Sequence, residues 1–530
     1  MRGMSGKYWY LVLAVAMVVC GGVLYQRTPY GGGGVYDSAD VAGLPEAQAS
    51  EIVELQDGDT YTLTARYVSK KINGAEYRML AYNGSIPGPL IKIPQGAEVA
   101  INLKNDTDMP TLLHSHGVRM DNRFDGSQTS QNPIPPGGSF AYTLKFPDAG
   151  MYWYHSHVRE DFQQELGLYG NFLVVPTDKD YWNPVNQEVP LILDDILIQD
   201  GKIELNKQTT DHALMGRYGN IALVNGETDY SLSVEKGEVI RFYLTNVANA
   251  RPFNAAIEGA RLKLVGTDGG AYEKDQWKDF VVIGPSERAV VEVLFDKSGT
   301  FAIQNKTPGR TYTLASVQVS NESAAVSYAS EFAVLKTHSA TVSNIDPLRS
   351  YFDKAPDKRI ALSLSTSGAS GQMQMNMGGG HMMPDGTMMG GSMMSTSPDG
   401  IEWDDTNMMS GPLSTTDTVQ WTITDQATGK VNSDIKWTVT KDQPMKIEIF
   451  NDPNSMHPMQ HPIHFHGQQF LVLSINGVKQ TNLVWKDTVL VPSGQTVDIL
   501  LYPTNPGEWM AHCHTAEHLE DGMMFTYTVR

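Results

Sequence analysis

Short segments in which apolar and polar side chains alternate with period two occur along most of the chain. Three of them end in asparagine, at residues 96–105, 237–246 and 444–451. This alternation predicts β-strands that bury one face. Turns rich in glycine and proline separate the segments, and few stretches have the 3.6-residue period of an amphipathic helix. The pattern therefore predicts an all-β protein.

A glycine that follows an acidic or proline-containing turn also recurs three times, each time before a predicted strand. The three positions are Gly150, Gly299 and Gly507. Five and seven residues further on, the outer two copies carry histidines, which are His155, His157, His512 and His514. The middle copy has Gln304 and Lys306 at these positions. The middle copy therefore lacks the imidazoles that could bind a metal.

The interval between the second and third copies is longer than the interval between the first and second. The first two glycines lie 149 residues apart and the first two asparagines 141, whereas the second intervals are 208 and 205 residues. This self-similarity predicts three related β-units, with an insertion in the third. We place the units near residues 48–180, 181–335 and 336–530. A metal cluster is then expected between the first and third units, with the second as a spacer.

Most of the extra length lies in residues 371–411. This stretch contains eleven of the 25 methionines, mixed with Gly, Asp and Ser, and has neither a helical nor a strand period. It therefore has no core of its own. Thioether sulfur prefers Cu(I) to hard cations, so the insertion is a candidate copper-collecting segment. The alternative is an exposed low-complexity loop that binds nothing.

The N-terminal segment has the pattern of an export signal. Arg2 and Lys7 precede an apolar run over residues 8–24. As a helix this run would span roughly 25 Å, which is short of the roughly 30 Å hydrocarbon core of a bilayer. We therefore expect residues 1–30 to be a signal peptide, with a retained membrane anchor as the alternative, and residues 31–47 to be a linker. The protein would act in the periplasm or at the outer face of the cytoplasmic membrane.

The charge of the chain narrows the range of partners. Asp and Glu outnumber Lys and Arg by 59 to 40, for a net charge of −19. A polyanion such as nucleic acid would be repelled, whereas metal cations would be attracted. Only two cysteines occur, Cys20 in the leader and Cys513 among histidines, so no structural disulfide is expected.

Residues 512–514 have the sequence His-Cys-His. On a strand, the two imidazoles point to one face and the thiol to the other, so one tripeptide can serve two metal sites. Cys513, His518 and Met523 are spaced five residues apart. A thiolate, two imidazoles and a distant thioether form the ligand set of a blue copper site, and His461 is the natural second imidazole.

Four histidine motifs carry a resemblance to a known family. They are His114-Ser115-His116-Gly117, His155-Ser156-His157, the HPIHFH segment at 461–466, and the HCHTAEHLEDGM segment at 512–523. Ten of the fourteen histidines fall inside them. In form and order these motifs resemble the four copper-binding segments of the multicopper oxidases. The resemblance implies three consecutive cupredoxin-like Greek-key β-sandwich domains.

The resemblance also implies four copper ions. A type 1 copper would be held by Cys513, His461, His518 and Met523, with Met524 as the alternative thioether. A type 2 copper would be held by His114 and His464. The type 3 pair would be held by His116, His155, His157, His466, His512 and His514.

Two carboxylates are assigned roles by the same resemblance. Asp125, nine residues after His116, would relay protons, and its alternative is a surface turn residue. Relatives often have a second relay Glu where this chain has Leu519, which leaves that relay in doubt. Asp487 is expected to bind substrate copper beside the type 1 site, the alternative being a strand-end carboxylate.

The methionine insertion resembles that of bacterial copper-tolerance oxidases. Its expected ligands for substrate copper are Met382, Met383, Met388 and Met389. Further donors, Met456, His457 and Met459, directly precede His461.

We therefore expect a monomeric multicopper oxidase that couples one-electron oxidation of Cu(I) to reduction of dioxygen to water. A laccase acting on phenols or aromatic amines is the nearest alternative. A copper storage or delivery protein is less well supported, because it would not need a thiolate between two cluster histidines. A copper nitrite reductase would lack the full set of histidine pairs.

Overall fold

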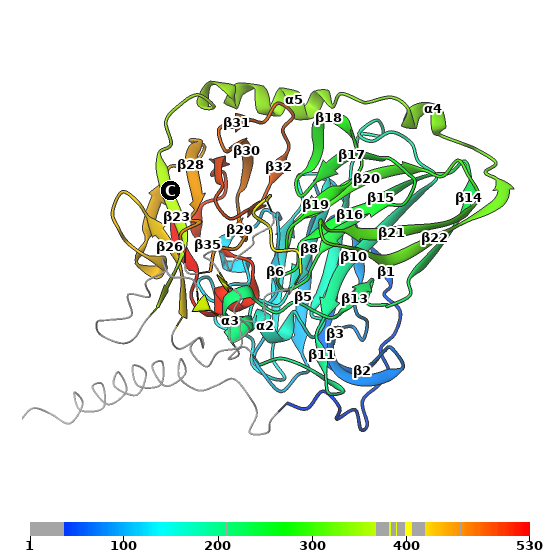
Figure 1. The fold of residues 1–530 in the computed structure, drawn as a ribbon, viewed down its shortest axis with the longest axis horizontal. Coiled ribbons are helices and arrows are strands. Elements are labelled where there is room, and N and C mark those ends of the chain that lie inside the picture. Colours follow the sequence, from blue (N-terminus) through cyan, green and yellow to red (C-terminus); the bar gives the residue numbers. More distant parts are fainter. Residues whose placement is uncertain are drawn as a thin grey trace, which may run out of the picture.

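The computed structural model describes residues 36–206, 210–366, 381–382, 388–389, 398–404, 419–455 and 457–530. The predicted leader lies outside these residues, as does most of the 371–411 insertion. Figure 1 shows three groups of strands, with the cyan strands β6 and β8 of the first group between the orange strands of the third and the green strands of the second. The prediction of an all-β protein is confirmed.

The first group has two sheets, with strand orders β1-β4-β9-β8-β6 and β3-β2-β5-β7. The bounds are β1 Ile52–Glu54, β2 Thr60–Ile72, β3 Ala75–Tyr82, β4 Leu90–Pro94, β5 Glu98–Asn105, β6 His114–Ser115, β7 Ser139–Lys145, β8 Gly150–His155 and β9 Tyr169–Val175. The short helices are η1 Asn122–Phe124 and α2 Glu160–Gln163.

The second group has the orders β13-β10-β15-β20-β17-β18 and β14-β22-β21-β16-β19, with a small β11-β12 pair. The bounds are β10 Gln187–Ile196, β11 Ile198–Gln199, β12 Lys202–Ile203, β13 Ile221–Val224, β14 Ser231–Lys236, β15 Val239–Asn246, β16 Phe253–Ile257, β17 Leu262–Thr267, β18 Gly270–Lys278, β19 Val281–Ile283, β20 Arg288–Leu294, β21 Gly299–Lys306 and β22 Thr311–Ser323. Helix α3 spans Thr210–Met215.

The third group has the orders β26-β23-β28-β34-β30-β31, with β32 beside β30, and β27-β36-β35-β29-β33. The strand bounds are β23 Lys358–Thr366, β26 Val419–Asp425, β27 Lys436–Val439, β28 Met445–Asn451, β29 His461–Phe465, β30 Gln469–Ile475, β31 Val478–Lys479, β32 Trp485–Lys486, β33 Thr488–Val491, β34 Thr496–Tyr502, β35 Gly507–Cys513 and β36 Met524–Val529. The helices between β22 and the C-terminus are α4 Ala329–Phe332, α5 Ser339–Ile345, η2 Asp346–Tyr351, η3 Asn432–Asp434 and α6 Ala516–Glu520.

The three recurring asparagines have one physical role. Each closes a strand (β5, β15 or β28), is fully or almost fully buried, and donates two hydrogen bonds from its amide nitrogen to backbone carbonyls. Asn105 donates to Met109 and Ile134 at 2.8 and 2.9 Å. Asn246 and Asn451 each donate one bond to a carbonyl of the loop that follows and one to the last residue of another strand, Ile283 of β19 and Val491 of β33 respectively. An amide with two donors can satisfy both buried carbonyls, which an aspartate could not do.

The clusters of buried apolar residues show how the groups of strands pack against one another. One apolar cluster runs through the first and third groups, where it includes Trp153 of β8 and Trp509 of β35, and it also takes in some residues of the second group, such as Ile192 and Leu223. The second group has a cluster of its own, around Leu244 and Val291. Burial of apolar surface therefore holds the first and third groups against each other, and their histidines lie at this junction.

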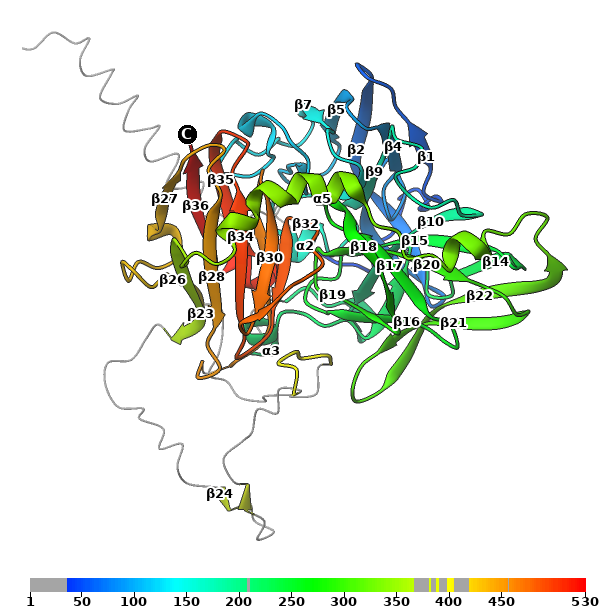
Figure 2. The ribbon, with the colours of Figure 1, turned by 90° about the horizontal axis from the view of Figure 1, so that it is seen from above.

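The chain between the second and third groups crosses the molecule as α5, seen from above in Figure 2 between β30 and β18. Ile345 at the end of α5 packs against Leu471 and Leu500. Among the described residues there is no helix long and apolar enough to cross a membrane.

Candidate metal centre

Strand pairing brings the histidine motifs together two at a time. In the first group, β6 pairs with β8 so that His114 lies opposite His155. In the third group, β29 pairs with β35 so that His464 lies opposite His512. All four side chains are buried. Each pair therefore presents two imidazoles toward the junction between the groups.

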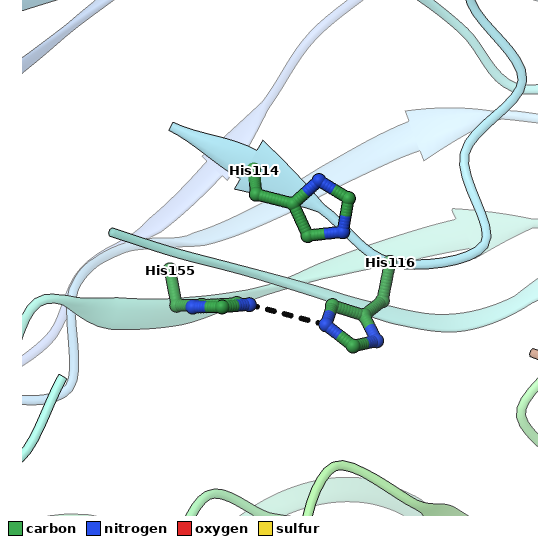
Figure 3. A group of neighbouring side chains, drawn as sticks. All are labelled: His114, His116 and His155. Atoms are coloured by element: carbon green, nitrogen blue, oxygen red, sulfur yellow. Dashed lines mark hydrogen bonds between the residues drawn. The ribbon is translucent and has the colours of Figure 1, made fainter. Parts of the chain in front are cut away.

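Across this junction the imidazoles form one cluster. The Nε2 atoms of His114 and His464 are 3.4 Å apart, and those of His466 and His512 are 3.0 Å apart. The Nε2 atom of His116 lies 3.1 Å from that of His155 (Figure 3) and 3.1 Å from that of His514. His157 can share one ion with His466 and His512. The structure thus brings together all eight histidines expected at the trinuclear site.

The protonation state of these rings suits metal binding. Nδ1 of His114 donates to the backbone oxygen of Asp125 at 2.7 Å, and Nδ1 of His512 donates to that of Cys513 at 2.9 Å. A carbonyl only accepts hydrogen bonds, so the proton sits on Nδ1 and the Nε2 lone pair points into the cluster. Lone pairs facing each other at these distances repel unless a cation lies between them. The donor set therefore fits metal ions.

Burial favours the neutral form of seven of these rings, those of His116, His155, His157, His464, His466, His512 and His514. It lowers the pKa of His512 well below the ordinary value, and the neighbouring imidazoles lower it further. Burial likewise lowers the pKa of His157 to about 3. Neutral imidazoles are the form that binds metals.

The glycine that ends the first motif is required by the packing. Gly117 has a φ of +70°, and a Cβ atom there would lie 2.6 Å from the Tyr152 ring and 2.8 Å from the Asp487 carboxylate. Gly467, after the third motif, would meet the Trp509 ring at 2.4 Å in the same way. Only glycine allows the chain to turn this tightly beside the histidines.

Asp125 is not a surface turn residue. Its side chain is fully buried, and its Oδ2 accepts a hydrogen bond from Nδ1 of His466 at 3.0 Å. Burial alone would raise the pKa of Asp125, but His466 and His114 outweigh this effect and hold the pKa well below its usual range. The carboxylate thus adjoins two histidines of the cluster, His114 from the first group and His466 from the third.

A second site lies on the other face of β35. Sγ of Cys513 is 3.6 Å from Nδ1 of His461 and 3.7 Å from Nδ1 of His518. Met523 is buried in the same loop, where its backbone nitrogen donates to the His518 oxygen at 3.0 Å. Met524 instead begins β36 and is partly exposed. The structure thus joins the expected thiol and imidazoles, with the first of the two methionines buried beside them.

The chemistry of this second site also fits a metal ion. Burial raises the pKa of Cys513 to about 12 and lowers the pKa of His461 to about 3. At neutral pH the protein alone would hold a thiol beside two neutral imidazoles. A soft cation that replaces the thiol proton would complete the ligand set.

Two elements that sequence reasoning missed cover this site. His518 Nε2 donates to the Leu214 oxygen on α3 at 3.1 Å. The Trp421 ring lies 4.8 Å from that of His461 and 4.4 Å from that of His518, and its Nε1 donates to Ala213. Both histidines are fully buried as a result. The two hydrogen bonds join residues 208 and 304 positions apart in the chain, so no local pattern signals them.

Asp487 is not where the sequence-based expectation placed it. Its side chain is almost fully buried and forms a two-pronged ion pair with Arg288, at 2.8 Å for the Nη1–Oδ1 contact. The nearby imidazoles are His116 and His464 of the histidine cluster. A carboxylate neutralised by arginine and facing this cluster does not fit the role of binding substrate copper beside Cys513, so that assignment is corrected.

A further buried pair lies before His461. His457 Nε2 is 3.6 Å from Oε2 of Glu402, and the two side chains are 2% and 6% exposed. Neither His457 nitrogen has a hydrogen bond among the described residues, nor does that Glu402 oxygen. Met459, also buried, follows two residues later. The motif context had singled out His457 and Met459, but Glu402 comes from the far end of the methionine insertion and was missed.

Sequence reasoning also missed Glu160. Its Oε1 lies 3.3 Å from Nε2 of His157, and the residue is 1% exposed. Leu519, where relatives often have a carboxylate, is buried. A single polar residue on the short helix α2 carries no signal in sequence.

The insertion is described only in part. His381-Met382 (β24) pairs antiparallel with Met388-Met389 (β25), so that Met382 lies opposite Met388. Met383 and Met456 lie outside the described residues. The expected copper-binding role of these methionines stays a prediction.

Comparisons with known proteins agree on one family. Three family models described as multicopper oxidase match residues 64–179, 153–331 and 374–530. The chain is 27% identical over 477 residues to a multicopper oxidase of Staphylococcus aureus, covering 88% of this chain and 87% of that one. It is 23% identical over 591 residues to copper resistance protein A of Escherichia coli, covering 88% and 92%. A solved multicopper oxidase from Campylobacter jejuni, titled a metallo-oxidase, matches with a TM-score of 0.66 at 23% identity, covering 93% of this chain and 99% of that one.

Proposed function

The chain belongs to the multicopper oxidase family and is an oxidoreductase that uses copper and oxygen, and we propose that it oxidises Cu(I) at the Cys513 site and reduces dioxygen to water at the histidine cluster. The observation that carries this proposal is the His-Cys-His segment on β35, whose thiol faces one buried donor set while its two imidazoles belong to the other.

Four copper ions, when bound, would supply the one-electron redox chemistry. We assign one to Cys513, His461, His518 and Met523, and three to the eight clustered histidines. Of these histidines, His114 and His464 are assigned to the type 2 ion and the other six to the type 3 pair. The three-dimensional grouping of their ring nitrogens supports this division.

The chain itself provides the route for electrons. Cys513 is covalently joined to His512 and His514, so an electron accepted at its sulfur crosses only a few bonds to reach two cluster ligands. The Nδ1 of His512 also donates to the Cys513 oxygen at 2.9 Å. This rigid link fixes the separation between the two sites.

Protons must reach the cluster as well, because four electrons and four protons convert one dioxygen into two waters. We assign their delivery to Asp125, which adjoins His466 and His114 and is shielded from solvent. A carboxylate held in this position can pass a proton without entering the metal coordination.

Two observations favour Cu(I) over an organic reductant. Trp421 and α3 bury both imidazoles of the Cys513 site, so a bulky phenol has no direct contact with them. In addition, the His457–Glu402 pair beside Met459 offers a metal ion two side chains next to the site whose facing atoms have no hydrogen-bond partner among the described residues. Thioether and imidazole ligands suit Cu(I). The name of the copper resistance relative is in keeping with this substrate.

The methionine insertion would then collect Cu(I) for the Cys513 site. We assign this role to Met382, Met383, Met388 and Met389. Export to the periplasm, or to the outer face of the membrane, would expose the enzyme to copper that enters from outside the cell.

The competing functions are separated by one deletion. Removing residues 371–397, which leaves Glu402, Trp421 and α3 in place, should reduce oxygen consumption driven by Cu(I) and leave the oxidation of phenols unchanged. A laccase would show no loss with Cu(I), and an unchanged rate with both substrates would refute the proposal. A storage protein would bind Cu(I) without consuming oxygen. Oxygen uptake by the purified, copper-loaded protein therefore tests all three.

A further inference from the structure

We propose that Arg288 is a positioning residue for the histidine cluster. Arg288 belongs to the second group of strands, which supplies none of the proposed copper ligands. It holds the Asp487 carboxylate against one imidazole from the first group and one from the third. The inference rests on the proposed function, because it assumes that these imidazoles hold copper.

The contacts of Arg288 reach all three groups. Its Nη1 donates to Oδ1 of Asp487 at 2.8 Å and its Nη2 donates to Oδ2 of the same residue, which belongs to the third group. Its Nε donates at 3.1 Å to the backbone oxygen of Met151 on β8, the strand of the first group that ends in His155. Nη1 also donates to Ser286 of its own group at 2.9 Å. One buried guanidinium therefore ties together the elements that surround the cluster.

Asp487 transmits this constraint to the imidazoles. Its backbone oxygen accepts a bond from His464 Nδ1 at 2.8 Å, and its Oδ1 lies 3.6 Å from the same atom. Oδ1 also lies 3.5 Å from Nδ1 of His116. Thr488 donates to Oδ1 at 2.9 Å. Groups that contact the far nitrogen of a metal-binding histidine orient the ring, and losing them typically weakens metal binding or activity roughly 10- to 100-fold.

The chemistry requires arginine at this position. The planar guanidinium presents parallel N–H groups that match both carboxylate oxygens, and it also donates to the backbone oxygens of Met151, Ser286 and Asp268. A lysine would keep the charge but could not hold Asp487 at both oxygens and reach Met151 as well. The second group, which has no ligands of its own, thus contributes to the site through this side chain.

A matched control exists in the same sheet. Arg241 on β15 is also buried and pairs with Glu292 through Nε and Nη2, at 3.1 and 2.6 Å. This pair lies within the second group and contacts no histidine of the cluster in the described residues. Arg241→Lys disrupts a comparable buried arginine–carboxylate pair, in which both nitrogens donate to Oε1 of Glu292, without touching the cluster.

The test compares Arg288→Lys with Arg241→Lys and the wild type. Each purified chain is loaded with copper, and its copper content, thermal unfolding and electron paramagnetic resonance spectrum are measured. We expect Arg288→Lys to keep the type 1 signal but to bind type 2 copper roughly 10- to 100-fold more weakly. Arg241→Lys should keep both signals, whatever its effect on thermal stability.

A type 2 signal in Arg288→Lys that matches Arg241→Lys in intensity and line shape would overturn the inference. If the wild type itself lacks a type 2 signal, the proposed function is overturned, and the inference with it. Where Arg288→Lys gives no folded protein, Asp487→Asn is judged by the same signal. Asparagine keeps the shape of the side chain but loses the two-pronged ion pair.

Discussion

The Nε2 atoms of His114 and His464 lie 3.4 Å apart although the two residues are 350 positions apart in the chain. One stands on the first group of strands and the other on the third, and the apolar cluster shared by these groups holds them together. Each ring also donates its Nδ1 proton to a backbone oxygen, of Asp125 and Asp487 respectively. Tertiary packing thus makes the Nε2 lone pairs of His114 and His464 face each other. The metal sites formed in this way lead to five predictions.

Cys513→Ser should remove one copper ion per chain and the intense visible absorption of a copper-bound thiolate. Serine oxygen is a poor ligand for soft copper, and the electron route to His512 and His514 would be lost. Oxygen consumption should stop while the histidine cluster keeps its metal. Absorption spectra and copper analysis of the purified variant check this, and an unchanged visible band would contradict it.

Gly117→Ala should destabilise the protein more than Gly74→Ala. Both glycines have a positive φ, which costs an alanine roughly 1–2 kcal/mol. Only at Gly117 would the new Cβ overlap a ring and a carboxylate, which adds roughly 1–3 kcal/mol. Denaturant unfolding of the two variants measures the difference. Equal destabilisation of the two variants would show that the tight packing beside His116 does not contribute to the free energy of unfolding.

Asp125→Asn should lower kcat for oxygen reduction by roughly 100-fold, the usual scale for a lost proton-transfer group, while the copper content stays the same. Asp121 is the control, because it lies in the same loop and is 54% exposed. Asp121→Asn should leave kcat unchanged. Steady-state oxygen uptake distinguishes the two, and equal rates would remove Asp125 from the proton route.

His457→Ala and Glu402→Gln should each raise the KM for Cu(I) about tenfold, equivalent to about 1.4 kcal/mol of binding free energy, with little change in kcat. The reason is that the two donors adjoin the electron-accepting site without forming part of it. His338→Gln, which breaks another buried histidine–carboxylate pair, is the control. A fall in kcat with no change in KM would argue against a docking role.

Metal-free protein should lose stability as the pH falls below about 6.5. Burial lowers the pKa of His157 and of His461 from 6.5 to about 3, so below pH 6.5 the unfolded chain binds protons that the folded chain does not. The stabilising contribution is complete above pH 6.5 and is lost progressively toward pH 3. Thermal unfolding at a series of pH values tests this. A melting temperature that stays constant from pH 7 to 4 would contradict it.

Much of the candidate site could be predicted because its signals are local. The i and i+2 spacing of His512 and His514 places two imidazoles on one strand face, and Cys513 between them must face the other way. The three buried asparagines and the glycines before the strands showed similar units from spacing alone. The expected assignment of Asp487 was wrong because a charged residue in a strand pattern does not reveal which buried partner neutralises it.

The chain by itself determined which side chains could bind copper and on which face of a strand each would point, because period-two geometry acts over neighbouring residues. Only the tertiary structure decided how those faces meet. Burial of apolar surface joins the first and third groups, closes Trp421 and α3 over the Cys513 site, and brings Arg288 of the second group to Asp487. These contacts depend on where distant segments pack, and no local spacing encodes that.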